Sequence, residues 1–133
     1  MSNSNLVTYT KLSPNMNAPR NQPISKITIH HMAGNYSLEQ LGESFSKSSR
    51  EASANYGIDS NGNVALYVDE GNRSWASASP WNDNRAVTIE VANDEIGGGW
   101  QAMPLSISLS TYVWTSVKEM VFDYLLTAQK MAI

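Results

Sequence analysis

Two adjacent histidines end an apolar, β-branched run, ITIHHMAG, at residues 27–34. His30 and His31 are the only histidines in the 133 residues. Neutral imidazole is the commonest protein ligand of metal ions, and imidazole is also the side chain that most often moves protons near neutral pH. The pair therefore suggests a metal site or a proton-transfer site, and the rest of the sequence has to supply the other groups.

A carboxylate in the later run AVTIEVAN is the second candidate. The apolar residues of this run occupy every second position, so Glu90 is expected on the face opposite Val87, Ile89 and Val91. A glutamate in the middle of a strand is often only a solvated residue. Beside a metal or a reacting bond, it would serve as a catalytic acid or base.

The elements that would position these groups can be read from hydrophobic periodicity. Residues 26–31 alternate like a strand with one buried face, which places His30 on the face opposite Ile27 and Ile29. Ser37 followed by Gln40 forms a capping box, which predicts the start of a helix. Residues 54–70 predict a β-hairpin that turns at Ser-Asn-Gly-Asn, residues 60–63. Residues 1–25 are polar and contain three prolines, and they predict an extended arm.

Composition excludes several classes of protein. The formal charge is -3 and the pI is near 5.2, so the basic excess typical of nucleic-acid binding is missing. Cysteine is absent, which excludes disulfides and thiolate ligands. The sequence contains neither a membrane-length apolar run nor a basic segment followed by an apolar one at its start. We expect the protein to be a monomer without nucleic-acid or membrane partners. We also expect it to be made in the cytoplasm without a signal peptide.

The order of four blocks carries a family resemblance: ITIHHMAG, ASANYGIDSNGNVALYV, NRSWASAS and NDNRAVTIEVAND. Together they resemble the zinc-dependent N-acetylmuramoyl-L-alanine amidases over about residues 7–100, most closely the catalytic domains of phage and prophage endolysins and more distantly the peptidoglycan recognition proteins. The resemblance implies an α/β fold in a single domain, with a mixed central β-sheet flanked by helices and a C-terminal part that is truncated or altered.

What the family does follows from the same resemblance. Its members hydrolyse the amide between N-acetylmuramic acid and the L-alanine of the peptidoglycan stem peptide, and endolysins use this reaction to lyse the cell wall. A zinc ion with three protein ligands activates water and polarises the carbonyl. His30 matches the first zinc ligand, whereas His31 points the other way along the strand. Glu90 matches the catalytic acid or base. Residues on the loop that borders the substrate groove are expected to contact substrate: Trp75, Trp81 and Asn84.

The sequence departs from the family pattern in its metal ligands. Some relatives have a tyrosine at the position of Ala54 and a histidine at that of Ala76, which puts more weight on Glu90. Relatives also supply a second histidine and a cysteine or aspartate after their last helix, but no histidine follows His31 here. The zinc site is therefore expected to be incomplete in this chain.

We divide the chain into the arm at residues 1–25, an amidase core at residues 26–101 and an atypical tail at residues 102–133. Back-translated with permitted codons and read one nucleotide out of step, residues 102–122 can spell DAAFNKLIDLCVDICKRNGI, which has the character of the helix that endolysin amidases carry here. This pattern predicts a frameshifted tail. Three interpretations stay open: a peptidoglycan amidase, a non-catalytic peptidoglycan-binding module, and an inactive product that lost its remaining ligands.

Overall fold

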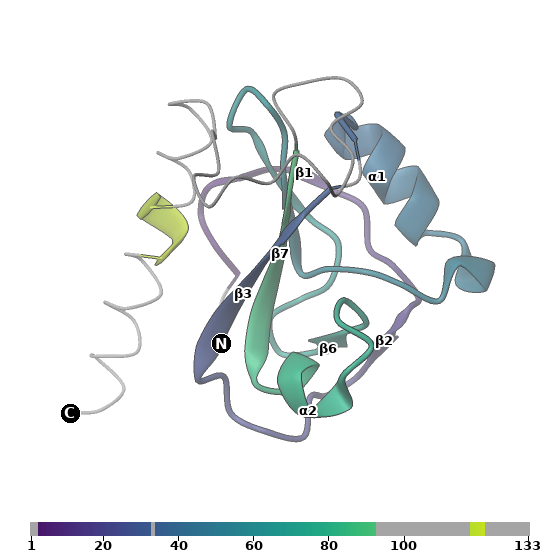
Figure 1. Ribbon diagram of the computed structural model, residues 1–133, viewed down its shortest axis with the longest axis vertical. Helices are drawn as coiled ribbons and strands as arrows, with labels where there is room; N and C mark the ends of the chain where they lie inside the picture. The colour runs from purple at the N-terminus through teal and green to yellow at the C-terminus, as the bar shows by residue number, and fades with distance from the viewer. Residues whose placement is uncertain (1–2, 33, 93–117, 122–133) are drawn as a thin grey trace.

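The computed structural model describes residues 3–32, 34–92 and 118–121 (Figure 1). A five-stranded sheet has the order β1-β5-β4-β7-β3, and β4 with β5 is its only antiparallel pair among the described strands. The strands of this sheet are β1 (Val7–Thr10), β3 (Lys26–His31), β4 (Tyr56–Ile58), β5 (Val64–Leu66) and β7 (Ala86–Val91). The remaining elements are β2 (Met16–Asn17) paired with β6 (Arg73–Ser74), α1 (Leu38–Phe45), the 3-10 turn η1 (Ser48–Arg50) and α2 (Pro80–Asp83). The mixed α/β fold expected from the sequence is confirmed.

Local signals placed most of these elements correctly. The two strands predicted from alternation are β3 and β7. The predicted capping box forms at the start of α1: the Ser37 side chain accepts from the Gln40 backbone N–H, and the Gln40 side chain accepts from the Ser37 backbone N–H. The predicted hairpin forms from β4 and β5. In its turn the Asp59 carboxylate accepts hydrogen bonds from the backbone N–H groups of Asn61 and Asn63, while Gly62 takes the positive φ of 82° that glycine tolerates.

Apolar layers cover the two faces of the sheet. Figure 1 shows α1 on one side of β3 and β7 and the helical turn at 118–121 on the other. Met120 from that turn is buried in the larger cluster with residues of β4, β5 and β7: Tyr56, Ile58, Val64, Leu66, Val87, Ile89 and Val91. The second cluster packs α1 against the other face through Leu38, Leu41, Phe45, Ala65 and Tyr67. Because side chains alternate along a strand, His30 and Glu90 lie on the α1 face.

The arm at residues 1–25 contributes more than an extended chain. Its strand β1 joins the edge of the main sheet, parallel to β5. Before β1, the backbone N–H of Ser4 donates to the Tyr56 hydroxyl at 2.8 Å, and the Asn3 side-chain amide donates to Asp69 at 2.7 Å. The Tyr56 hydroxyl in turn donates to the Glu70 carboxylate at 2.5 Å. These bonds attach the first described residues to the buried hairpin.

Tyr67 lies directly over a glycine of β4. Its hydroxyl donates to the Leu38 carbonyl at 2.7 Å, and its ring meets Phe45 edge-on with centroids 5.4 Å apart. A Cβ on Gly57 would lie 2.7 Å from Tyr67 Cε2, which is closer than carbon atoms normally approach. Glycine at position 57 is therefore needed for the buried tyrosine to pack under α1.

Gly57→Ala is expected to destabilise the protein by about 1–3 kcal/mol, because the pinned Tyr67 ring has to move. Urea denaturation followed by far-UV circular dichroism measures this loss. Gly71→Ala is the matched control, since a Cβ there meets no atom within 4 Å. Equal stability of the two variants would contradict the prediction.

Candidate functional site

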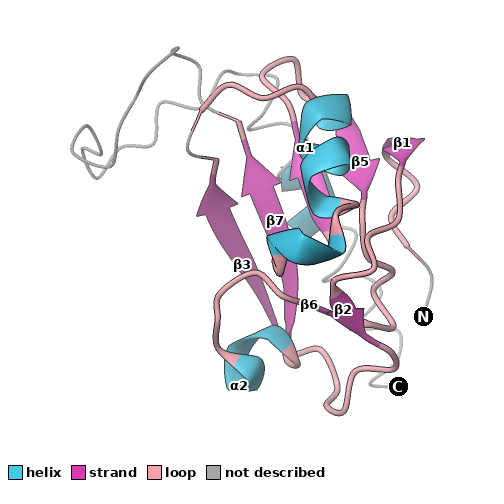
Figure 2. Cartoon of the chain, turned by 90° about the vertical axis from the view of Figure 1, so that its right-hand side faces the viewer, coloured by secondary structure: helices cyan, strands magenta, loops and turns pink. Residues whose placement is uncertain are grey.

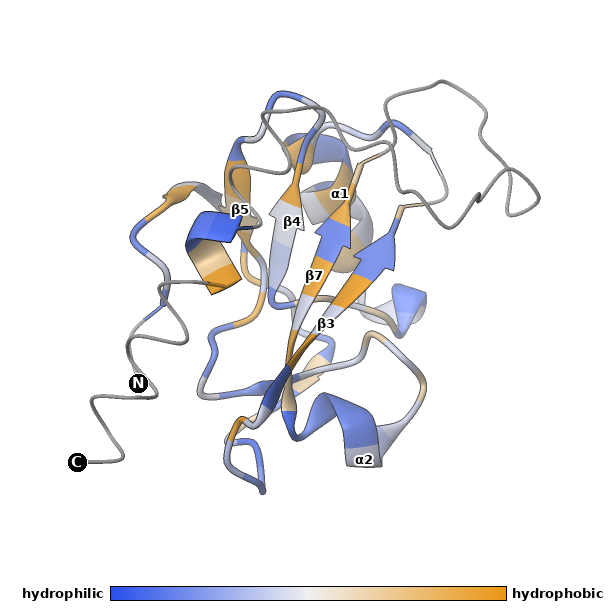
Figure 3. Ribbon diagram, turned by 60° about the vertical axis from the view of Figure 1, so that its left-hand side comes forward, coloured by the Kyte–Doolittle hydropathy of each residue, from blue (hydrophilic) through white to orange (hydrophobic). Residues whose placement is uncertain are grey.

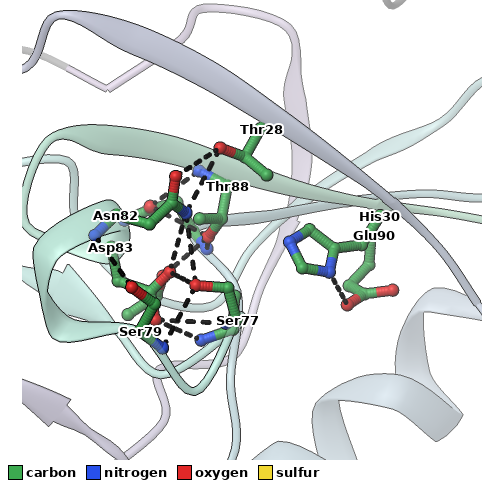
Figure 4. Close-up of polar contacts among 11 residues, drawn as sticks. Thr28, His30, Ser77, Ser79, Asn82, Asp83, Thr88 and Glu90 are labelled. Atoms are coloured by element: carbon green, nitrogen blue, oxygen red, sulfur yellow. Dashed lines mark hydrogen bonds and ion pairs between the residues drawn. The ribbon is translucent and has the colours of Figure 1, made fainter.

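His30 and Glu90 are cross-strand neighbours. Strands β3 and β7 run parallel with His30 in register with Glu90, so both side chains leave the sheet on the same face. His30 Nδ1 lies 4.0 Å from Glu90 Oε1, and the two side chains are 26% and 18% exposed (Figure 4). The structure thus brings together the two groups that the sequence singled out from segments 60 residues apart. Figure 3 shows the hydrophilic segments near the tips of both strands.

Burial sets the protonation of the glutamate. Loss of hydration raises the pKa of the Glu90 carboxyl above its usual value of 4.5, while the His30 imidazole and the Arg50 guanidinium act in the opposite direction. The net effect is upward. The carboxyl therefore keeps its proton to higher pH than an exposed glutamate does, as suits a group that gives a proton to a leaving amine.

This pKa shift makes a prediction about stability. With a raised pKa in the folded state, the native protein binds more protons than the unfolded chain at pH values from the usual glutamate pKa up to the raised one. The contribution of Glu90 to the free energy of unfolding therefore falls as the pH rises through that window. Glu90→Gln cannot titrate, so its stability relative to wild type is expected to be higher at pH 8 than at pH 4.

Urea denaturation at the two pH values measures this difference. Glu39→Gln removes a carboxylate from an exposed position of α1 and is the matched control. A relative stability of Glu90→Gln that does not rise with pH would show that Glu90 is hydrated in the folded protein.

The second nitrogen of His30 is buried without a partner among the described residues. His30 Nε2 is buried, and no group in the described part of the chain makes a hydrogen bond to it. Buried imidazole nitrogens are normally satisfied, so an orphaned one is typical of a site that meets a ligand. The next residue, His31, faces Val91 across the strands and, by the alternation of β3, projects to the opposite side of the sheet from His30.

Thr88, two residues before Glu90, is held by a polar network that the sequence did not predict. The fully buried Asn55 accepts a hydrogen bond from the Thr88 backbone N–H at 3.0 Å and donates to the Val68 carbonyl at 3.0 Å. The Thr88 hydroxyl accepts from the Asn55 backbone N–H and lies 2.6 Å from Ser74 Oγ. These bonds hold β7 in register beside β4. A polar residue just before a buried strand was the only signal in the sequence.

A second network holds the loop beside the site. The buried Asp83 carboxylate accepts hydrogen bonds from the backbone N–H groups of Ala76 and Ser77, both at 3.1 Å, and from the Ser77 hydroxyl at 2.5 Å. Ser79 caps α2, and Asn82 reaches Thr28 on β3 (Figure 4). The loop therefore has a defined shape beside Thr28, which lies two residues before His30 on β3. Figure 2 shows α2 near the start of β3 and β7, away from their tips.

The three residues predicted to contact substrate lie in different environments. Trp75 is half-buried and donates from its indole N–H to Asn17 Oδ1 at 2.7 Å. Trp81 is 65% exposed. Asn84 is buried, accepts from the Asn21 backbone N–H and donates to the Pro80 carbonyl, so its amide already has structural partners. Contact of these residues with substrate stays a prediction.

The described residues do not fit a catalytic zinc ion. Such an ion takes three protein ligands, usually imidazole, thiolate or carboxylate. The described ranges contain no cluster of three histidine, cysteine, aspartate or glutamate residues able to hold a metal, and the full sequence has no histidine after His31 and no cysteine. His30 and Glu90 are one potential ligand and one potential acid, so we derive no chemical step through a metal.

Comparisons with known proteins identify the fold and the family. The crystal structure of a selenomethionine AmpD derivative superposes with a TM-score of 0.66 at 15% sequence identity, covering 90% of this chain and 74% of the other. No curated protein matches the sequence significantly. The family model described as N-acetylmuramoyl-L-alanine amidase matches residues 20–117, which is more than half of the chain and extends into the predicted tail. The chain therefore belongs to the N-acetylmuramoyl-L-alanine amidase family.

Proposed function

We propose that this chain is the catalytic domain of an endolysin-type peptidoglycan amidase. Its target is the amide between N-acetylmuramic acid and the L-alanine of the stem peptide, and its role is lysis of the bacterial cell wall after synthesis in the cytoplasm. We further propose that it acts as a monomer, without nucleic-acid or membrane partners. The observation that carries the proposal is the His30–Glu90 pair in a member of the amidase family. Its Glu90 carboxyl has a raised pKa, and its buried His30 Nε2 has no hydrogen-bond partner among the described residues.

In this proposal Glu90 handles the protons of the reaction. The carboxylate takes a proton from the attacking water, and the protonated carboxyl gives it to the amide nitrogen as the bond to the muramoyl carbonyl breaks. Because Glu90 is largely buried, its pKa is raised above that of an exposed glutamate, and in this proposal the raised pKa suits a group that both takes and gives a proton. His30 stands beside the same carboxyl, and no described residue occupies its Nε2, which in this proposal meets a ligand.

Zinc dependence needs donors beyond the described residues. The acidic residues in the rest of the chain are Asp94, Glu95 and Asp123, and with His30 they would give a set of one imidazole and carboxylates. This set differs from the two histidines with a cysteine or aspartate that the family resemblance implies. Hydrolysis by this chain therefore depends on an unusual set of ligands.

The missing ligands favour a second candidate function. A groove that keeps its shape without a metal would bind muropeptides and release no stem peptide. Backbone and side-chain groups satisfy Asn55 and Asp83, and in this candidate these bonds hold the loop and β7 in place with or without a metal. This candidate predicts muropeptide binding that a chelator does not change.

One experiment separates the two functions. Purified protein is analysed for zinc by mass spectrometry, assayed for release of stem peptides from cell walls, and titrated with soluble muropeptide with and without EDTA. One zinc per chain with release that EDTA abolishes supports the amidase. Binding that persists in EDTA without release supports the binding module. Neither binding nor release would refute both and leave the third interpretation, an inactive product.

A separate proposal concerns the origin of the tail at residues 102–133. We propose that this segment is read out of frame and that the usual metal ligands were lost with it. Met120 in this range is buried against the sheet, so the tail contributes at least this side chain to the core. Reading the coding DNA tests the proposal, because codons that cannot spell the alternative helix would refute it.

A further inference from the structure

Two cations lie close to the exposed tryptophan of α2. Lys26 Nζ lies 4.4 Å from the centroid of a Trp81 ring, and Arg85 Cζ lies 4.7 Å from it. The Arg85 guanidinium also donates to the Trp81 carbonyl at 3.0 Å, and the Lys26 backbone N–H bonds to the Arg85 carbonyl. Cation–π attraction and these bonds hold both charges in place beside the indole.

Neither cation is neutralised by a carboxylate in residues 3–32, 34–92 and 118–121. The close pairs of basic and acidic side chains found there, Lys11 with Glu43 and His30 with Glu90, include neither Lys26 nor Arg85. Within the described part of the chain, two positive charges therefore lie together, although the formal net charge of the whole sequence is -3. Surface lysines and arginines are commonly paired or dispersed, so this local excess is available to an anion.

The position of this cluster separates it from the His30–Glu90 pair. Lys26 and His30 are on the same face of β3, four residues apart, which corresponds to about 13 Å along a strand. The indole is 65% exposed and stands on the surface rather than in a closed cavity. An exposed position suits a segment of polymer more than a small molecule that needs to be enclosed.

We propose that Trp81, Lys26 and Arg85 form a cation–indole site that binds a phosphodiester-linked anionic polymer of the cell wall. This proposal rests on the proposed wall-directed function, but it needs neither zinc nor hydrolysis. Phosphodiesters stay ionised at all relevant pH values, and guanidinium and ammonium groups both pair well with phosphate oxygens. The exposed part of the indole offers an apolar surface to the carbon skeleton of the polymer.

Sedimentation of the protein with purified cell walls tests the site. Two wall preparations are compared, intact walls and walls from which hydrofluoric acid has removed the phosphodiester-linked polymers but not the peptidoglycan. The variants are Trp81→Ala and the double variant Lys26→Gln with Arg85→Gln. Lys11→Gln with Lys47→Gln removes the same charge near α1 and is the matched control. Thermal unfolding establishes that each variant folds.

The wild type and the control are expected to bind intact walls alike. The double variant and Trp81→Ala are expected to bind intact walls about tenfold more weakly, equal to about 1.4 kcal/mol. Wild-type binding is expected to weaken similarly on stripped walls and at high salt, because the contact is ionic. The wild type, the control and the double variant are expected to bind soluble muropeptide equally, which distinguishes this site from the groove.

Three results would overturn the proposal. Intact walls bound equally by the wild type and the double variant would show that the cations do not contribute. A second result is that the wild type binds intact and stripped walls equally while the double variant binds both more weakly. The cations would then bind the carboxylates of the stem peptides and not a phosphodiester-linked polymer. Equal weakening in the control variant would show a general effect of charge. A wild type that does not bind soluble muropeptide would refute the proposed groove and would leave the proposal for Trp81, Lys26 and Arg85 unchanged.

Discussion

Glu90→Gln is expected to lower stem-peptide release from cell walls by about 100- to 10,000-fold, the usual contribution of a general acid or base. The amide has nearly the size of the carboxyl, but it can neither take a proton from water nor give one to the leaving nitrogen. The burial of Glu90 against β3 should preserve its position in the variant. Release of the new amino group is followed by chromatography of the soluble products.

Glu39→Gln is the control for this measurement, since it makes the same chemical change at an exposed position of α1. The control should release stem peptides at the wild-type rate. A Glu90→Gln variant as active as the control would remove Glu90 from the reaction. A wild type that releases nothing would exclude the amidase proposal and leave the muropeptide-binding candidate.

Arg20→Met is expected to produce the largest loss of stability, about 3 kcal/mol or more. The Arg20 guanidinium donates hydrogen bonds to carbonyl oxygens from two separate segments, at distances between 2.6 and 3.3 Å: Glu70, Asn72, Asp83, Asn84 and Ala86. Methionine has a similar length but no donors. Partly buried carbonyls then lose their partners, and the loop that carries α2 loses its connection to the end of the hairpin.

Urea denaturation measures this effect, with Arg85→Met as the control. The Arg85 guanidinium donates to a single carbonyl in the described part of the chain, that of Trp81, so its loss is expected to cost about 1 kcal/mol. Similar midpoints for the two variants would show that the Arg20 bonds are replaced by water without loss. A much lower midpoint for Arg20→Met would establish this residue as the link between the two segments.

The sequence predicted what depends on local patterns. Alternation predicted β3 and β7 and placed His30 and Glu90 each on the face opposite the apolar residues of its own strand. The pairing of the two strands, which the structure shows, makes the two residues neighbours. Contacts between distant segments left no local trace. The sequence did not show that β1 pairs with β5, that Arg20 reaches carbonyls more than 50 residues away, or that Lys26 lies over Trp81.

The predicted site residues illustrate the same division. Trp75, Trp81 and Asn84 were grouped because they share one polar loop, but the fold gives them different partners: Asn17 of the arm for Trp75, two cations for Trp81, and the Pro80 carbonyl of α2 for Asn84. Asn55 was missed because its role depends on a strand that begins 31 residues later. Polar residues that satisfy backbone groups across a fold are recognised only once the partners are known.

The bonds from Asn3 and Ser4 to the hairpin have a practical consequence for handling the protein. An affinity tag fused directly before Asn3 would crowd the point where the Ser4 amide meets the Tyr56 hydroxyl. A protease cut between Ser4 and Val7 would free β1 from its anchor and leave the edge of β5 open to pairing with another molecule. Preparations that lose their first residues should therefore be the first to aggregate.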